Sequence, residues 1–196
     1  DLQARVVAGG FDIGLAFDGD ADRVFVVDEA GRGLSGSTTT ALLAAGVLRT
    51  NPGATILHNL ICSRAVPEVI REHGGTPVRT KVGHSFIKQR MAETGAVFGG
   101  EHSAHYYFLK NFRADSGLIA SMLVLNEVSR AHTDLSVLRK PFWRAKADTA
   151  ALIALASSAR LFSVSAAPCC ATAASLASSM SMATTVAPKA CATCTQ

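Results

Sequence analysis

Three aspartates at alternate positions form the motif with the clearest chemistry in this chain. They belong to the run D-G-D-A-D-R at 18–23, which stands between two apolar segments. Carboxylates this close together cannot all be ionised cheaply without a cation, and their oxygens suit a hard divalent ion such as Mg²⁺. Arg23 can pair with a phosphate brought to that ion. We therefore expect Asp18, Asp20 and Asp22 to bind Mg²⁺.

The same loop has two other interpretations. One is a polar loop that only caps a hairpin of strands. The other is a calcium EF-hand, because the aspartates match its first, third and fifth positions and Glu29 falls at its twelfth. However, Arg23 stands where an EF-hand needs glycine, and the flanking segments are strands rather than helices. The magnesium loop is therefore the favoured interpretation.

A second motif, G-G-E-H-S-A-H at 99–105, brings a carboxylate, a hydroxyl and two imidazoles together after an apolar segment. A carboxylate such as Glu101 can accept hydrogen bonds from sugar hydroxyls, and Ser103 can add another contact. A loop that is merely hydrogen-bonded to itself is the competing interpretation of this motif.

A third motif, K-V-G-H-S at 81–85, reads as a turn from a strand into a helix. The glycine frees the backbone, and the N-terminus of a helix favours an anion. Lys81, Gly83 and His84 are therefore candidates for contacts with an anionic ligand. His84 alone could equally be a residue that caps the helix.

The elements that must position these motifs alternate between strands and helices. We expect strands at 12–17, 23–28, 54–57, 77–80, 96–98 and 105–108, and helices at 37–49, 65–73, 85–93 and 116–130. Ser37 is the expected N-cap of the first of these helices. Such alternation predicts βαβ units and a mainly parallel sheet. Ligands of such sheets bind outside the carboxyl ends of the strands, where the motifs fall.

Composition narrows the class of protein. The chain has 196 residues, 48% of them hydrophobic, and a net charge of +4. Its Lys and Arg residues are scattered, so we expect no nucleic-acid partner and favour an anionic small molecule. We found neither an apolar run of the roughly 18 residues that a membrane span needs nor a secretory signal, so we expect no membrane partner and a cytoplasmic protein. Cys62 is the one cysteine before the last 30 residues, and we expect it to be a buried thiol.

The end of the chain differs from the rest. Residues 151–196 contain no Asp, Glu or Gly and are dominated by Ala, Ser, Thr and Cys. This is low-complexity sequence, and we expect it to be poorly ordered beyond about Leu161. A shifted reading frame near residues 142–150 in a GC-rich gene would produce a sequence of this composition. The alternative is a natural disordered extension of the protein.

Taken together, the three motifs resemble the α-D-phosphohexomutase family. D-G-D-A-D-R resembles its metal loop, and K-V-G-H-S-F-I-K and G-E-H-S-A-H resemble loops of its third domain, in the same order. Within the family, G-E-H-S-A-H-Y-Y-F is most similar to bacterial phosphomannomutases. Phosphoglucosamine mutases tend to have Gln and Gly where this chain has His102 and Ala104, which makes them the less favoured comparison. The resemblance covers about residues 1–140.

The resemblance implies an α/β fold in three parts. Residues 1–34 would be the end of the family's second domain, which has a mixed sheet and carries the metal loop. Residues 35–140 would be a complete third domain with a mainly parallel sheet, which recognises the sugar. Residues 141–196 would be an aberrant tail, expected to be disordered.

The resemblance also implies a reaction and a role for each candidate residue. Family members interconvert hexose 6-phosphates and 1-phosphates through a phosphoserine and Mg²⁺; here we expect mannose phosphate, with glucose phosphate as a second candidate. By analogy, His105 and Arg23 would be catalytic. The substrate would contact Glu101, Ser103, His84, Lys81 and Gly83, and the metal would be held by Asp18, Asp20 and Asp22.

The chain departs from the family's pattern in three places. The phosphoserine motif T-A-S-H-N-P and the fourth-domain phosphate loop R-T-S-N-T do not occur in it, and Ile61 stands where many relatives have Lys. It begins with Asp1 rather than Met, so we expect a fragment of a larger reading frame. Because the phosphoserine motif and the phosphate loop are missing, we expect this fragment to be inactive on its own. The alternative hypothesis is a truncated or frameshifted remnant that only binds metal or sugar phosphate.

Overall fold

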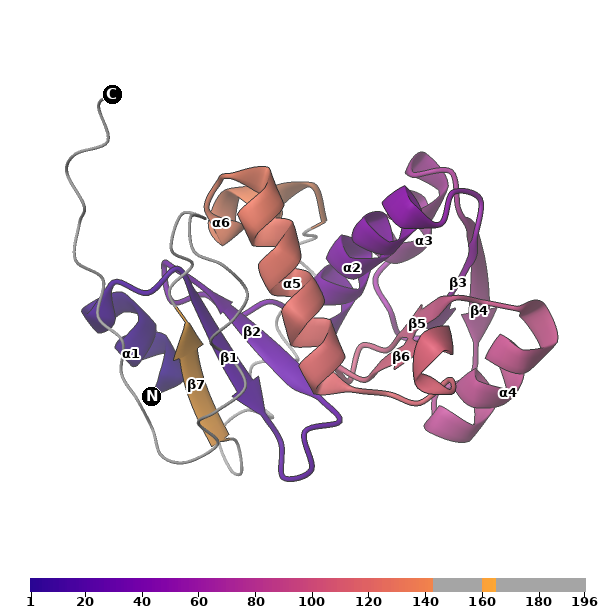
Figure 1. Cartoon of the computed structure of the whole chain (residues 1–196), viewed down its shortest axis with the longest axis horizontal. Helices are drawn as coiled ribbons and strands as arrows, with labels where there is room; N and C mark the ends of the chain where they lie inside the picture. Colours follow the sequence, from indigo (N-terminus) through magenta and orange to yellow (C-terminus); the bar gives the residue numbers. More distant parts are fainter. Residues whose placement is uncertain (143–159, 165–196) are drawn as a thin grey trace, which may run out of the picture.

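The computed structural model describes residues 1–142 and the backbone of residues 160–164. These residues form two sheets with helices packed around them (Figure 1). In chain order the elements are α1 (Leu2–Gly9), β1 (Ile13–Phe17), β2 (Val24–Asp28), α2 (Gly36–Thr50), β3 (Thr55–Asn59), α3 (Ala65–Glu72), β4 (Thr76–Thr80), α4 (His84–Thr94), β5 (Phe98–Gly100), β6 (Tyr106–Phe108), η1 (Leu109–Asn111), α5 (Gly117–Ala131), α6 (Leu135–Leu138), η2 (Lys140–Phe142) and β7 (Arg160–Val164).

The first sheet has the order β2-β1-β7, and both of its strand pairs are antiparallel. Every residue of β1 and β2 is buried, because α1 packs on β1 and α5 packs on β2. Gly14 lets α1 come close, since a Cβ at this position would lie 2.6 Å from a methyl group of Val6. The D-G-D-A-D-R loop is the connection between β1 and β2, so it lies at the end of a rigid hairpin.

The second sheet has the order β4-β3-β5-β6. Strand β3 is parallel to β4 and β5, and β6 is an antiparallel edge strand. Successive side chains of a strand point to opposite faces. Accordingly, Ile56 packs into a core with Val66 and Ile70 of α3, whereas Leu57 packs with Ile87 and Met91 of α4. Helices therefore cover both faces, and the mainly parallel α/β sheet predicted from the sequence is confirmed.

One hydrophobic core joins the two sheets, because the cluster around Val6 and Ile13 continues into Leu42, Phe98 and Val124. A buried ion pair fastens the end of the described segment to the first sheet.

In this pair, Nη1 of Arg139 lies 3.2 Å from Oδ2 of Asp28 and also donates to the carbonyl of Gly33. The side chain of Asp28 is fully buried, and it also accepts from the backbone N–H groups of Ala30 and Arg32. The last helical turns are thereby held against the turn that follows β2.

The expected boundaries needed small corrections. The N-cap of α2 is Ser35, whose hydroxyl accepts from the N–H of Thr38, and not Ser37 as predicted. Strand β5 begins at Phe98, later than predicted. Helix α1 was not predicted, because Leu2–Gly9 lacks a pronounced apolar period.

Most of the tail predicted over 141–196, with its expected disorder and reading-frame shift, lies outside the described residues. The exceptions are Pro141 and Phe142, which end η2, and β7, a strand that was not predicted. Among the helices of the described segment, none combines the length and the apolarity that a membrane crossing requires.

Candidate functional site

The metal loop brings its three aspartates together at the end of β1. Asp18, Asp20 and Asp22 each offer an oxygen, and these oxygens lie within 4.8 Å of one another. The loop turns sharply at Ala21, which has a positive φ of 60° and donates its N–H to the carbonyl of Asp18. Oδ1 of Asp22 is buried and accepts no hydrogen bond from the described residues. This set of hard oxygens fits a magnesium ion.

Arg23 holds one side of this loop. Its Nε lies 2.5 Å from Oδ2 of Asp18 and 3.7 Å from Oδ1 of Asp22. Burial alone would raise the pKa of Asp18, but the hydrogen bonds and the charge of Arg23 outweigh it and leave that pKa below its ordinary value. Burial raises the pKa of Asp22, and the nearby charges of Asp18 and Asp20 add to the increase. A cation would relieve this repulsion between the carboxylates.

Residues 101–105 form the turn between β5 and β6, which we call the sugar loop after its predicted role. Contacts with neighbouring segments fix the shape of this loop. The N–H of Glu101 donates to the carbonyl of His105, and Ala104 adopts a positive φ of 71°. The first residue of α2 presses against it, because a Cβ on Gly36 would lie 2.3 Å from the carbonyl oxygen of His102. Only glycine fits this close approach of two backbones.

Glu101 is the most connected side chain of the site. It is 2% exposed, and its Oε1 accepts from Nδ2 of Asn59 and from the N–H of Gly83, each at 3.1 Å. Its Oε2 accepts from the hydroxyl of Tyr107 at 2.9 Å. Burial, with the charge of Glu101, raises the pKa of Tyr107 far above its ordinary value, so that hydroxyl remains a donor. Glu101 thus ties the second motif to the third.

The side chain of His105, at the end of the sugar loop, reaches across to the metal loop. Its Nδ1 is 3.0 Å from Oγ of Ser103 and 3.7 Å from Oε2 of Glu101, while its Nε2 is 3.6 Å from Oδ2 of Asp22. The backbones of Arg23 and His105 also form an isolated antiparallel bridge. The metal loop and the sugar loop, which are far apart in the sequence, therefore lie side by side.

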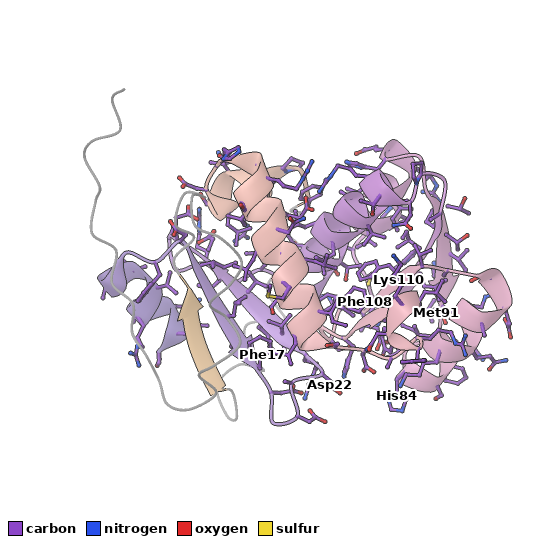
Figure 2. The ribbon with its side chains drawn as sticks, in the orientation of Figure 1. Phe17, Asp22, His84, Met91, Phe108 and Lys110 are labelled. Carbon is purple, nitrogen blue, oxygen red and sulfur yellow. The ribbon has the colours of Figure 1, made fainter. Side chains whose placement is uncertain are left out.

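The remaining predicted residues belong to the third motif and lie at the exposed edge of the site, called the rim below. Lys81 and His84 are exposed, and Nζ of Lys81 lies 5.5 Å from the ring centroid of Phe86. Figure 2 shows His84 and Asp22 along the same edge of the molecule. Gly83 has a φ of 120° and turns its N–H to Glu101, so the backbone of this turn joins the site while the two side chains remain in solvent.

Comparison with known proteins agrees with this arrangement. The sequence model of the family "Phosphoglucomutase/phosphomannomutase, alpha/beta/alpha domain III" matches residues 35–145. The chain belongs to this family.

Its relatives within the phosphohexomutases include phosphomannomutases from distant organisms. It is 46% identical over 124 residues to the phosphomannomutase of Escherichia coli K12, which covers 63% of this chain and 27% of the relative. It is 39% identical over 142 residues to the phosphomannomutase of Methanocaldococcus jannaschii, with 72% of this chain and 32% of the relative covered. The chain therefore spans about 27–32% of the length of the curated relatives it matches.

Solved structures show the same fold. A phosphoglucomutase/phosphomannomutase family protein from Burkholderia thailandensis matches with a TM-score of 0.67 and 37% identity, over 72% of this chain and 31% of that one. A protein from Thermus thermophilus, described as a phosphomannomutase, matches with a TM-score of 0.64 at 24% identity over 71% of this chain and 33% of that one, which shows the fold alone.

Three residues of this candidate site were not predicted from the sequence. Asn59 and Tyr107 hold Glu101, and Asp115 places an oxygen within 4.8 Å of ligand atoms of Asp22 and His105. Asn59 could have been found, because it is a polar residue at the carboxyl end of a buried strand. Asp115 could not, since its position depends on the bridge between Tyr107 and Asp115, which folds its segment back beside β6.

Proposed function

We propose that this chain forms the metal-binding and sugar-binding part of a hexose-phosphate mutase, which interconverts the 6-phosphate and 1-phosphate of mannose, with glucose as a second substrate. One observation carries the proposal. The bridge between Arg23 and His105 sets an acidic, metal-suited loop directly beside a loop of carboxylate, hydroxyl and imidazole. A phosphorylated sugar needs both kinds of partner at once.

The metal loop would act on the phosphate. Asp18, Asp20 and Asp22 would hold Mg²⁺, which supplies charge stabilisation to the transferring phosphoryl group when bound. Arg23 is half-exposed, so the part of its guanidinium that does not contact Asp18 can donate to phosphate oxygens. Because Asp18 fixes its Nε, the guanidinium is oriented before the phosphate arrives.

The sugar loop would act on the hexose. Glu101 and Ser103 can each accept or share a hydrogen bond with sugar hydroxyls, and Gly83 places the backbone of the third motif next to them. Three donors already occupy three of the roughly four lone-pair sites of the Glu101 carboxylate. Glu101 is therefore rigid, which favours discrimination between hydroxyl positions. His105 would take the proton from the hydroxyl that attacks phosphorus.

Two alternatives remain as outcomes of the test. The chain could be a remnant that binds metal or sugar phosphate without catalysis, or it could derive from a phosphoglucosamine mutase. Residues His102 and Ala104 favour the mannose enzyme over the glucosamine enzyme. We expect the 196 residues alone to bind without turnover, since the family's phosphoserine motif is not among them.

A chimera tests the proposal directly. The 124 matching residues of the E. coli phosphomannomutase are replaced by those of this chain, and turnover of mannose 1-phosphate is measured in a coupled assay with a bisphosphate activator. We expect activity within about tenfold of the parent, and a loss of about 10²-fold or more on Asp20→Asn, because the metal contributes most of the charge stabilisation.

Glucose 1-phosphate and glucosamine 1-phosphate serve as comparison substrates. A chimera that melts like its parent and binds Mg²⁺ but has no turnover with any of them would favour the binding-only remnant. A preference for glucosamine 1-phosphate would transfer the assignment to the glucosamine enzyme.

A further inference from the structure

A second group of metal-ligand side chains lies beside the aspartate loop. Asp22, His105 and Asp115 each present a ligand atom, and these atoms lie within 4.8 Å of one another. They come from three separate segments: the metal loop, the sugar loop and the stretch that leads into α5. All three side chains are partly buried. The group differs from the aspartate loop in its donors, because it contains an imidazole nitrogen.

The hydrogen bonds of His105 orient it as metal-bound histidines are oriented. Its Nδ1 faces Oγ of Ser103 at 3.0 Å and the carboxylate of Glu101 at 3.7 Å. Its Nε2 faces Oδ2 of Asp22 at 3.6 Å. A histidine that ligates a metal usually donates its other N–H to an oxygen of this kind.

The two carboxylates are also held in place. The segment of Asp115 is paired with Tyr107, and Oδ1 of Asp115 lies 3.5 Å from Nζ of Lys88. Asp22 keeps Oδ1 buried without a hydrogen bond from the described residues. Gly117 fits the start of α5 against the metal loop, since a Cβ there would lie 2.6 Å from the backbone of Arg23. The triad is thus supported by packing on every segment that contributes to it.

We propose that Asp22, His105 and Asp115 form a binding site for a divalent transition metal, such as Mn²⁺ or Zn²⁺, distinct from the oxygen-only site of the aspartate loop. Imidazole with carboxylates suits these metals, whereas Mg²⁺ prefers oxygen alone. An octahedral ion with bonds of about 2.1 Å sets its ligands roughly 3 to 4 Å apart. The observed spacing therefore needs only a small contraction, which the ion would drive as it displaces Lys88 from Asp115.

The shared ligand Asp22 makes the two metal positions interdependent. An ion on the triad draws Oδ2 of Asp22 toward His105, so it competes with an ion at Asp18 and Asp20. One consequence rests on the proposed function, in which His105 is the general base. The ion on the triad would occupy the lone pair of His105 that accepts the proton. Transition metals would then inhibit the magnesium-dependent reaction.

Pulsed electron paramagnetic resonance of the 196-residue chain with Mn²⁺ tests the site without an activity assay. A bound imidazole gives a ¹⁴N modulation on the Mn²⁺ signal, and oxygen ligands alone do not. We expect this modulation in the wild type and in the control His84→Gln, and its loss in His105→Gln. Asp115→Asn should weaken the nitrogen-coupled Mn²⁺ by about tenfold or more.

The double variant Asp18→Asn, Asp20→Asn separates this proposal from the magnesium site. It should retain the nitrogen modulation, because it leaves the triad intact. Mn²⁺ that binds without nitrogen coupling, or coupling that survives His105→Gln in a chain with wild-type circular dichroism, would overturn the triad. So would a complete lack of Mn²⁺ binding, which would mean that a proton on His105 and the ammonium of Lys88 neutralise the carboxylates. The first of these outcomes would leave the aspartate loop as a metal site.

Discussion

Two arginines that bind the same carboxylate in different surroundings allow a matched test of burial. Arg139 and Arg32 each place a nitrogen 3.2 Å from Oδ2 of Asp28, but their side chains are 10% and 60% exposed. The contact distance is equal, so a difference between the two substitutions reports the surroundings. Removing one partner of a buried pair costs about 3–5 kcal/mol, because the other charge is left in a poor solvent. An exposed ion pair is worth about 0–1 kcal/mol.

We expect Arg139→Met to lower the free energy of unfolding by about 3 kcal/mol, at the lower end of that range because the backbone donors of Ala30 and Arg32 still hold Asp28. Arg32→Met should cost less than about 1 kcal/mol. Urea denaturation at pH 7 measures both, and the midpoint of Arg139→Met should fall by about 1–2 M.

A double-mutant cycle with Asp28→Asn isolates the pair, since it subtracts the lost packing of the arginine stem. Equal costs for the two methionine variants would refute the reasoning, because burial would then not determine the strength of the contact. A coupling energy near zero between Arg139 and Asp28 would likewise assign the loss to packing rather than charge.

Three further predictions concern single residues near the site. Gly36→Ala should destabilise the chain by about 1–3 kcal/mol in urea denaturation, because its Cβ would lie 2.3 Å from a backbone oxygen. The control Gly19→Ala places its Cβ where no atom lies within 4 Å and should cost far less. Equal effects of the two substitutions would contradict the close approach at Gly36. Burial, together with nearby arginine charges, lowers the pKa of His58 below its ordinary value of 6.5. Near that pH the unfolded chain therefore binds more protons than the folded chain. The free energy of unfolding should be highest above pH 6.5 and fall as the pH drops through that value. Urea midpoints from about pH 5 to 8 measure this, and His58→Gln should flatten the profile; an unchanged slope would exclude His58. Burial raises the pKa of Cys62 to about 12, so iodoacetamide at about pH 8.5 should modify it about 10³-fold more slowly in the folded chain than in urea, as read by peptide mass spectrometry; equal rates would show an accessible thiolate.

The parts of the site that could be predicted from the sequence are those whose residues are close along the chain. The aspartates of 18–23 must lie together because small residues separate them, and a buried strand on each side fixes where they lie. The order of apolar segments and turns likewise predicts the parallel sheet. These inferences need only the local periods of strands and helices.

The parts that could not be predicted depend on contacts between distant segments. Asp115, which lies far along the chain from Asp22, becomes its neighbour through the bridge to Tyr107 and the packing of α5 against the metal loop. Ser37 shows the same limit for a helix cap. As a polar residue before an apolar run it was a reasonable N-cap, yet its hydroxyl is taken by His102 and by the N–H of Ser63. Because these contacts with distant segments occupy the hydroxyl of Ser37, Ser35 is the N-cap of α2 instead.

Backbone contacts hold the metal loop on two sides. Arg23 bridges His105 by backbone, and the N–H of Gly117 donates to the carbonyl of Ala21 at 3.0 Å. Backbone contacts survive most substitutions, because they do not depend on side-chain identity. Exposed positions of the rim, such as Lys81 and His84, can therefore change over generations without moving the aspartate loop. In a lineage built on this scaffold, the exposed rim can drift while the geometry of the aspartate loop is inherited intact.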